Sequence, residues 1–255
     1  MDLKKAIDSI WECKQQGIYY PSQWKGRFDV DTGYRLQLGI LDKELRGGAS
    51  QAGWKVGLTA RAIQEQVGFH EPVFGYLLQG GALASEAALD FDDLVAPCVE
   101  FELCLEIGER LEGPGVTFEQ ARAAISGVAP GIEVVERRGD FIADPALSMA
   151  DNVQQKAFVT GPFTRPVPHG LVLAGTRARI SVNGEVAEEA TGAEVLGDPA
   201  HSVEWLANRL AGFGKALEKG SLVFSGSFTR QFPINQGDYV EAEFEPFGRV
   251  ALSIK

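Results

Sequence analysis

The sequence predicts an α+β protein in which helices come first and a mixed, mostly antiparallel β-sheet system follows. Three observations indicate this class. Apolar residues recur at helical spacing in the first 50 residues, and short strands with glycine-rich turns dominate from about residue 82. Neither an internal repeat nor a low-complexity linker divides the chain. We therefore expect a mostly helical portion over residues 1–80 and a β-rich portion over residues 81–255, joined in one compact unit.

The N-terminal portion is expected to hold helices and one clear strand. Leu3, Ile7 and Ile10 recur at helical spacing, and a glycine just beyond them can end that helix. The expected elements, in order, are a helix ending at Gly17, a helix over residues 30–47, a strand over residues 52–59 (AGWKVGLT), and a short helix, a turn at Glu71-Pro72 and an extended segment within residues 60–78.

The β-rich portion is expected to hold strands separated by two helices. One helix starts with the capping box Thr117 to Gln120, and the other has Asp198 at its N-cap and Pro199 at its first position. Asn183-Gly184 is a strong hairpin turn. The expected strands lie at residues 96–108, 128–138, 156–161, 178–190 and 221–228 and in a final hairpin over 237–255, with an irregular loop at 139–152.

The composition argues against several kinds of partner. Of the 255 residues, 45% are apolar and 23% are charged, which is ordinary for a globular protein. The formal net charge is −11 and no basic stripe is present, so we expect no nucleic acid and no membrane partner. No apolar run approaches the length of about 18 residues that a membrane span needs, and the N-terminus lacks the core of a signal peptide.

The cysteines indicate a reducing compartment. Cys13, Cys98 and Cys104 lack metal-finger spacing. Cys98 and Cys104 lie in or beside one strand, six residues apart, which is too extended for a disulfide between them. We expect all three to be reduced thiols in a cytoplasmic protein.

The strand at residues 96–108 (APCVEFELCLEIG) carries an unusual pair of charges. Apolar side chains alternate with Glu100, Glu102, Cys104 and Glu106, which predicts a half-buried strand. Neighbours two apart on one face lie about 6–7 Å apart, so Glu100 and Glu102 repel one another. The alternation alone leaves two interpretations open, which are a solvated outer face and a cation held between the carboxylates.

A third carboxylate, Glu133, favours the interpretation in which the carboxylates hold a cation. Glu133 lies in the next strand, and a helix connects the two strands. Strand–helix–strand units commonly place their strands side by side, so Glu133 is expected beside Glu100 and Glu102. Three converging carboxylates need a counter-ion, and a hard divalent cation suits an oxygen-only site. Zinc is not expected, because these strands contain none of the three histidines, His70, His169 and His201.

Motifs along essentially the whole chain resemble one protein family. In order they read GWKVGLT, EPVFGYL, VEFELCLEIG, PGIEVVERR, ADN, VNGE, GAEVLGDP, VEWLANRLAGFGKALEKG and SGSFTR. Their order and spacing resemble the bacterial 2-oxopent-4-enoate hydratases, the oxalocrotonate decarboxylases and the 2-oxohept-4-ene-dioate hydratases, a branch of the fumarylacetoacetase superfamily. The resemblance implies a fumarylacetoacetase-like mixed β-sheet roll or barrel, with Mg²⁺ or Mn²⁺ held by Glu100, Glu102 and Glu133 in the β-rich portion.

The resemblance also implies an activity. We expect a hydratase that adds water to a 2-hydroxy-dienoate or 2-oxo-enoate, a dicarboxylate included, in aromatic meta-cleavage catabolism. The alternatives are a 4-oxalocrotonate-type decarboxylase, a fumarylacetoacetase-type C–C hydrolase that uses His70-Glu71, and a non-catalytic partner subunit. In both lyase reactions the cation polarises the C2 oxygen of the acid, where an enolate forms, and protons must move beside it.

Two motifs imply catalytic roles by the same resemblance. Lys55 in GWKVGLT matches the family's active-site lysine, which would hold the substrate carboxylate or move a proton; its ammonium form is disfavoured near a cation. Asp151 and Asn152 in ADN are expected to act in catalysis or to orient water and substrate. The alternatives are an exposed surface lysine and an ordinary Asp-Asn turn.

Three further residues are expected to contact the substrate. Thr59 and Ser227 offer hydroxyl groups, and Arg230 at the end of SGSFTR could pair with the distal carboxylate of a diacid. The alternative for Ser227 is a Gly-Ser turn without a role in binding, and the alternative for Arg230 is an ordinary surface arginine.

Departures from the family pattern surround the substrate and leave the glutamates intact. Glu136 and Arg137 stand where relatives carry an aspartate and a small residue before the matching Arg138, and VQQ follows ADN. These differences bear on the identity of the substrate. The expected partners are a small 2-oxo or 2-hydroxy acid, further copies of the chain in a homo-oligomer, and a paralogous enzyme of the same pathway.

Overall fold

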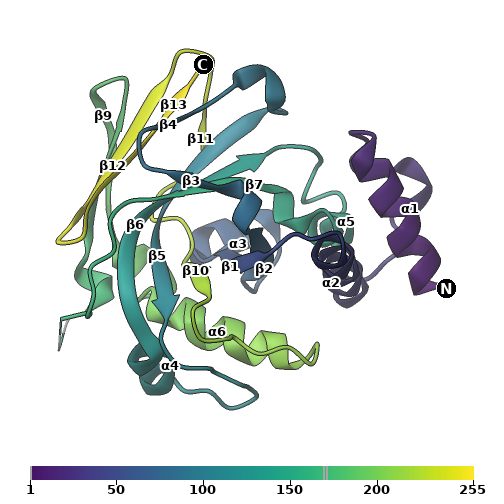
Figure 1. The fold of residues 1–255 in the computed structure, drawn as a ribbon, viewed down its shortest axis with the longest axis horizontal. Helices are drawn as coiled ribbons and strands as arrows, with labels where there is room; N and C mark the ends of the chain where they lie inside the picture. The colour runs from purple at the N-terminus through teal and green to yellow at the C-terminus, as the bar shows by residue number, and fades with distance from the viewer. Residues whose placement is uncertain (1, 169, 171) are drawn as a thin grey trace.

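The computed structural model describes residues 2–168, 170 and 172–255, so His169 lies outside the described residues. Two β-sheets lie at the centre, and helices cover their sides (Figure 1). The helices are α1 (Leu3–Gln15), α2 (Val30–Arg46), α3 (Arg61–Val67), α4 (Phe118–Ala124), α5 (Pro145–Ala150) and α6 (Ala200–Ala211), with 3-10 helices η1 (Ser22–Trp24), η2 (Gln79–Gly81), η3 (Phe91–Asp93), η4 (Asn152–Gln154), η5 (Leu173–Gly175) and η6 (Gly192–Glu194). The strands are β1 (Gln51–Gly57), β2 (Val73–Leu78), β3 (Ala82–Ala84), β4 (Ala87–Leu89), β5 (Pro97–Ile107), β6 (Ile125–Glu136), β7 (Gln155–Thr160), β8 (Arg177–Val182), β9 (Glu185–Thr191), β10 (Leu222–Phe224), β11 (Phe232–Pro233), β12 (Tyr239–Glu245) and β13 (Gly248–Ile254).

The first sheet is built around the long strands β5 and β6. Its order is β2-β1-β10-β5-β6-β7-β3, and β11 pairs with β5 on the same edge as β10. β6 curves along its length, so the sheet curls like half of a barrel (Figure 1). The apolar face of β5 is fully buried, as its alternation predicts; this face carries Val99, Phe101, Leu103 and Leu105.

The second sheet packs on the first and completes the core. Its order is β4-β13-β12-β8-β9, and β12 and β13 lie against β6. Asn183 and Gly184 form the predicted turn of the β8–β9 hairpin, both with positive φ (53° and 82°). The buried apolar side chains of the two sheets, such as Ile132 of β6 and Phe244 of β12, belong to one continuous core.

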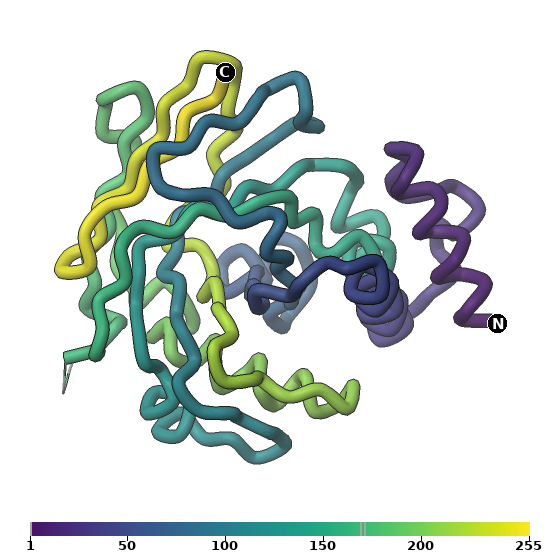
Figure 2. Tube along the Cα trace, viewed as in Figure 1, coloured from purple at the N-terminus to yellow at the C-terminus, as the bar shows by residue number. Residues whose placement is uncertain are grey.

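The helices form two groups at the sides of the sheets (Figure 2). α1 packs on α2 and α2 packs on α5, while α4 packs on α6. The caps that begin the helices follow from the sequence: the Asp29 side chain accepts the Thr32 N–H at 2.8 Å, and the capping box of Thr117 and Gln120 is present.

The α+β class and most predicted elements are confirmed. The irregular loop predicted over residues 139–152 is wrong in part, because α5 lies within it. Asp144 caps this helix by accepting the Leu147 N–H at 3.0 Å, and Pro145 stands at its start. Six residues are too short for helical periodicity to show. The predicted N-cap of α6 is displaced by one residue, to Pro199.

The first 80 residues do not form helices alone. β1 pairs with β2 and, in parallel, with β10 from the C-terminal part of the chain. A domain boundary near residue 80 stays a prediction. All three cysteines are free thiols, as expected. Among the described residues, the helices lack the combination of length and apolar character that would let one span a membrane.

Candidate metal centre and active-site cavity

The three predicted glutamates meet on one face of the first sheet. β5 and β6 pair so that Glu100 lies opposite Glu133 and Glu102 lies opposite Gly131. One carboxylate oxygen from each glutamate lies within 4.8 Å of the others. The antiparallel pairing of two strands joined by α4 therefore brings the carboxylates together, as the sequence predicts.

These carboxylates do not form a solvated face. Glu102 and Glu133 are fully buried, and Glu100 is half-buried. The Oε1 atom of Glu102 and both oxygens of Glu133 have no hydrogen-bond partner among the described residues. Since buried polar atoms in proteins are nearly always bonded, oxygens left in this state are available as ligands.

Lys55 is the cation that the fold places against the glutamates. It lies on β1 and is only 2% exposed, and its Nζ lies 3.4 Å from Oε1 of Glu133. Burial by itself lowers the pKa of Lys55, but the charges of the nearby glutamates, Glu133 first, raise the pKa above its ordinary value. In the protein alone the ammonium form is therefore favoured, and the expectation that a bound cation disfavours this form stays a prediction. The alternative of an exposed surface lysine is excluded.

The glutamates themselves are hard to ionise together. Burial raises the pKa of Glu102 well above its ordinary value, and the charges of Glu133 and Glu100 raise it further. Burial also raises the pKa of Glu133, to about 8, although Lys55 opposes this change. A bound divalent cation would favour the ionised form of all three carboxylates.

The donor set fits a hard divalent cation. Mg²⁺ and Mn²⁺ prefer oxygen ligands and usually keep positions for water and substrate, which three carboxylates allow. Within the described part of the chain, the cluster holds neither the histidine nor the cysteine ligands that zinc prefers. The fit is supported by two features: one oxygen from each glutamate lies within 4.8 Å of the others, and buried oxygens of Glu102 and Glu133 have no hydrogen-bond partner among the described residues.

A glycine turn after β10 orients one of the glutamates. The Gly226 N–H donates to Oε2 of Glu102 at 2.7 Å. Gly226 has a φ of +106°, and a Cβ there would lie 2.4 Å from Oγ1 of Thr59. Only glycine suits both conditions. Thr59 therefore packs against the turn that positions Glu102.

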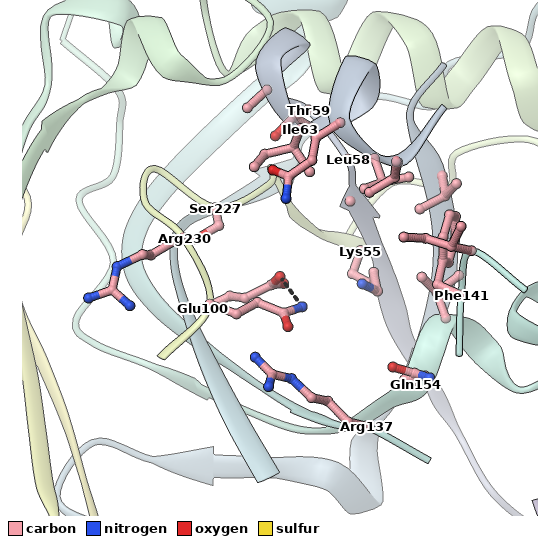
Figure 3. A pocket seen from close by; sticks show the side chains of 18 of the residues that line it. Lys55, Leu58, Thr59, Ile63, Glu100, Arg137, Phe141, Gln154, Ser227 and Arg230 are labelled. Atoms are coloured by element: carbon pink, nitrogen blue, oxygen red, sulfur yellow. Dashed lines mark hydrogen bonds between the residues drawn. The ribbon is translucent and has the colours of Figure 1, made fainter. Parts of the chain in front are cut away.

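A cavity of about 560 Å³ opens onto the cluster (Figure 3). Lys55 and Glu100 connect the cluster to the cavity, and the predicted residues Thr59, Ser227 and Arg230 line it. Much of the remaining wall is apolar, which suits the carbon chain of an organic acid; it includes Leu58, Ile63, Val67, Val73, Phe141 and Val153.

Ser227 and Arg230 lie on the same segment but have different surroundings. The Ser227 Oγ accepts the backbone N–H of Phe101 at 3.3 Å, beside Glu100. Arg230 is 65% exposed, its Nε lies 3.6 Å from Glu188, and its guanidinium lies 4.5 Å from the centre of the Phe232 ring. Figure 3 shows the Arg230 side chain pointing away from Glu100. Arg230 thus has a carboxylate partner of its own.

Asp151 and Asn152 do not line the cavity. The Oδ2 of Asp151 accepts from Nε of Arg138 at 2.7 Å in a buried ion pair. The side chain of Asn152 accepts the Tyr76 N–H at 2.7 Å and donates to the Tyr76 carbonyl at 2.9 Å. Both residues therefore support the cavity wall from behind.

The segment after Asp151 has a strained backbone. Asn152, Val153 and Gln154 have φ values of 56°, 49° and 62°, which is rare for a β-branched valine. The Gln154 Nε2 donates to the Tyr20 hydroxyl at 3.0 Å and to the Gly139 carbonyl at 2.7 Å, which fixes this conformation. As a result Val153 and Gln154 line the cavity. The VQQ departure from the family pattern predicted a difference near the substrate, but neither residue was assigned a role from the sequence.

Two other cavity residues were missed. The Gln231 Nε2 donates to Oε1 of Glu100 at 2.8 Å (Figure 3). Arg137 also lines the cavity, and its only signal was its departure from the family pattern. His70 and Glu71, the pair considered for a C–C hydrolase, are not among the described residues that line the cavity.

The fold and the site together define a class of protein: an α+β protein with a curled mixed sheet and a buried carboxylate cluster at the base of an apolar cavity. The chain belongs to the fumarylacetoacetate hydrolase family, since the family described as Fumarylacetoacetate (FAA) hydrolase C-terminal matches residues 59–255. The predicted resemblance and fold are confirmed.

Individual relatives point to two activities. The chain is 33% identical over 230 residues to the 2-hydroxyhexa-2,4-dienoate hydratase of Comamonas testosteroni, covering 88% of this chain and 85% of the relative. It is 34% identical over 213 residues to the 4-oxalocrotonate decarboxylase of Pseudomonas sp. (strain CF600), covering 83% and 80%. The solved structure of 4-oxalocrotonate decarboxylase from Pseudomonas putida G7, complexed with magnesium and adipate, matches with a TM-score of 0.92 and 26% identity over 99% of this chain and 98% of that one.

Proposed function

We propose that this protein is a divalent-metal-dependent lyase that hydrates a 2-hydroxy-dienoate or 2-oxo-enoate. The observation that carries the proposal is the cluster of Glu100, Glu102 and Glu133 at the base of an organic-acid-sized cavity, in which the buried Glu102 and Glu133 have unbonded oxygens. Relatives named as hydratases of such acids support it.

The glutamates would hold Mg²⁺ or Mn²⁺. When bound, the cation supplies Lewis-acid polarisation of the C2 oxygen of the substrate. Lys55, in contact with Glu133, is placed to bind the carboxylate head of the substrate and to deliver or remove a proton beside it. Thr59 and Ser227 offer hydroxyl groups at the same wall of the cavity. The apolar residues around them suit the carbon chain of the acid.

Asp151 and Asn152 would act through other groups. Asp151 holds Arg138, and Asn152 holds β2, which neighbours β1 and Lys55. We assign both as positioning residues, since neither lines the cavity.

Decarboxylation of an oxalocrotonate-type diacid is the second candidate. The TM-score of 0.92 to a decarboxylase over nearly the whole of both chains favours it. The same cation and lysine would serve, because electrons left by departing CO₂ flow into the same enolate. We further propose that the protein is a cytoplasmic homo-oligomer that associates with a paralogous enzyme of its pathway. In such a complex this chain could also be a non-catalytic partner subunit, and the experiment below tests that role.

Product analysis distinguishes these activities. Purified protein with Mg²⁺ is incubated with a 2-hydroxy-dienoate and, separately, with 4-oxalocrotonate, and hydroxylated product and CO₂ are measured. We expect a hydroxylated 2-oxo acid, formed only in the presence of the metal. Release of CO₂ without hydration assigns the decarboxylase. No turnover of either acid by metal-loaded protein assigns the non-catalytic role.

A further inference from the structure

Arg137 extends the strand face that carries the glutamates. Its N–H donates to the Ala96 carbonyl at 3.2 Å, which continues the pairing of β5 and β6 past Glu136. Because strand side chains alternate, Arg137 lies on the face of Glu133, four residues or about 13 Å further along. Arg137 lines the cavity, and Figure 3 shows its side chain pointing toward the side on which Glu100 lies.

Arg137 is an exposed residue of the cavity lining, and its side chain has no partner among the described residues. Among the described residues, its guanidinium forms no ion pair and no side-chain hydrogen bond, whereas Lys55 pairs with Glu133 and Arg230 pairs with Glu188. Asp140 also lines the cavity, but its Oδ1 accepts the N–H groups of two residues of its own loop, at 2.9 Å and 3.1 Å. A carboxylate that enters the cavity therefore meets one free guanidinium.

Apolar side chains of the cavity that Arg137 lines suit a carbon chain. Val73, Phe141 and Val153 line the same cavity and offer no charge. A guanidinium binds a carboxylate through two parallel hydrogen bonds, which gives arginine an advantage over lysine for this task. The cavity therefore combines the glutamate cluster, which can hold a divalent cation, with an apolar lining and with Arg137, which can bind a carboxylate.

We propose that Arg137, and not Arg230, binds the distal carboxylate of the substrate, which is therefore a 2-oxo or 2-hydroxy dicarboxylate. The inference rests on the proposed function, because the glutamates must hold the other end of the acid.

The test compares two acids with the same carbon chain, 2-oxoadipate and 2-oxohexanoate. Their affinities for the Mg²⁺-loaded protein are measured by titration calorimetry. We expect the wild type to bind the diacid at least about tenfold more tightly, since each tenfold step is about 1.4 kcal/mol and one charge-assisted pair supplies it. Arg137→Gln should remove this preference and leave the affinity for the monoacid unchanged, while Arg137→Lys should restore part of it. Arg230→Gln, the matched variant, should keep the preference.

Four results would overturn the inference. A wild type that binds both acids equally leaves the proposed function standing but removes the receptor. The same holds for equal losses with both acids in Arg137→Gln, or for a preference lost in Arg230→Gln instead. A wild type that shows no Mg²⁺-dependent binding of either acid overturns the proposed function and this inference together.

Discussion

At the scale of single residues, each glutamate of the cluster is oriented by a different group. The glycine turn after β10 donates its N–H to Glu102, the Gln231 amide donates to Glu100, and Lys55 contacts Glu133. Because each carboxylate has a partner of its own, loss of one carboxylate charge leaves the other two in place. Single substitutions can therefore separate metal binding from folding.

Glu102→Gln tests the metal site. The amide keeps the shape of the side chain, and its oxygen can still accept the Gly226 N–H, so the fold should remain. We expect the affinity for Mg²⁺, measured by calorimetry, to fall by more than about tenfold and activity to be lost. Glu106→Gln is the matched control, because Glu106 lies on the same face of β5 but pairs with Arg165 outside the cavity. Unchanged affinity in Glu102→Gln would contradict the assignment.

Lys55→Ala tests the proton-transfer and substrate-binding role. Removal of a buried general acid or base should lower kcat by a factor of about 10² or more. Mg²⁺ binding should not weaken, because Lys55 competes with the cation for Glu133. Steady-state kinetics and Mg²⁺ titration check the two parts separately. Lys215→Ala, which removes a lysine paired with Asp42, serves as control, and a rate like that of wild type in Lys55→Ala would remove the lysine from the mechanism.

At the scale of elements, Arg138 joins the end of β6 to the segment after α5. Its Nη1 donates to Oε2 of Glu136 and its Nε donates to Oδ2 of Asp151, both at 2.7 Å. All three side chains are buried. A buried charge pair costs much stability when one partner is lost, because the other charge stays unpaired. This network therefore holds the wall of the cavity.

Arg138→Leu should lower the free energy of unfolding by about 3–5 kcal/mol, since it leaves the buried Asp151 without its ion-pair partner and leaves Glu136 with Lys156 alone, at 3.5 Å. Urea denaturation measures the loss. Arg165→Leu breaks the ion pair with Glu106, but the Arg165 side chain is 49% exposed, so this control should lose only about 0–1 kcal/mol. Equal losses in the two variants would show that the Arg138 network has no special structural role.

The sequence predicted the arrangement of some elements and side chains but not of others. Alternation in β5 and the helix connecting it to β6 predicted the meeting of Glu100, Glu102 and Glu133, because strand period and connection are local signals. The pairing of Arg230 with Glu188 could not be predicted, since it depends on how two distant strands are arranged. The left-handed conformation of Val153 could not be predicted either, because valine disfavours it and tertiary contacts impose it.

At the scale of the whole molecule, the site depends on the closure of the first sheet. Lys55 comes from β1, whose parallel pairing with β10 brings the N-terminal part beside β5. The alternation of residues along a strand does not indicate which strand it pairs with, and only the family resemblance implied that Lys55 belongs to the site. A cation bound by β5 and β6 would also offset the negative charge that Lys55 balances in part. Metal binding should therefore stabilise the fold as a whole.

The size of that stabilisation should depend on pH. Because burial raises the pKa of Glu133 from 4.5 to about 8 and also raises that of Glu102, the metal-free folded protein holds protons that the unfolded chain releases above about pH 4.5. This contribution to stability is present at low pH and is lost as the pH rises through about 8. Mg²⁺ binds the ionised carboxylates, so it must displace those protons at low pH and meets fewer of them at high pH.

The increase in Tm that Mg²⁺ produces, relative to EDTA-treated protein, should therefore be larger at pH 8 than at pH 6. Thermal unfolding followed by circular dichroism at both pH values measures it, and the comparison with and without metal cancels the titration of groups far from the site. Glu102→Gln should show a much smaller increase at both pH values, because one carboxylate ligand is gone. If the increase in Tm is equal at the two pH values, or larger at pH 6, then metal binding does not displace protons from the glutamates of β5 and β6.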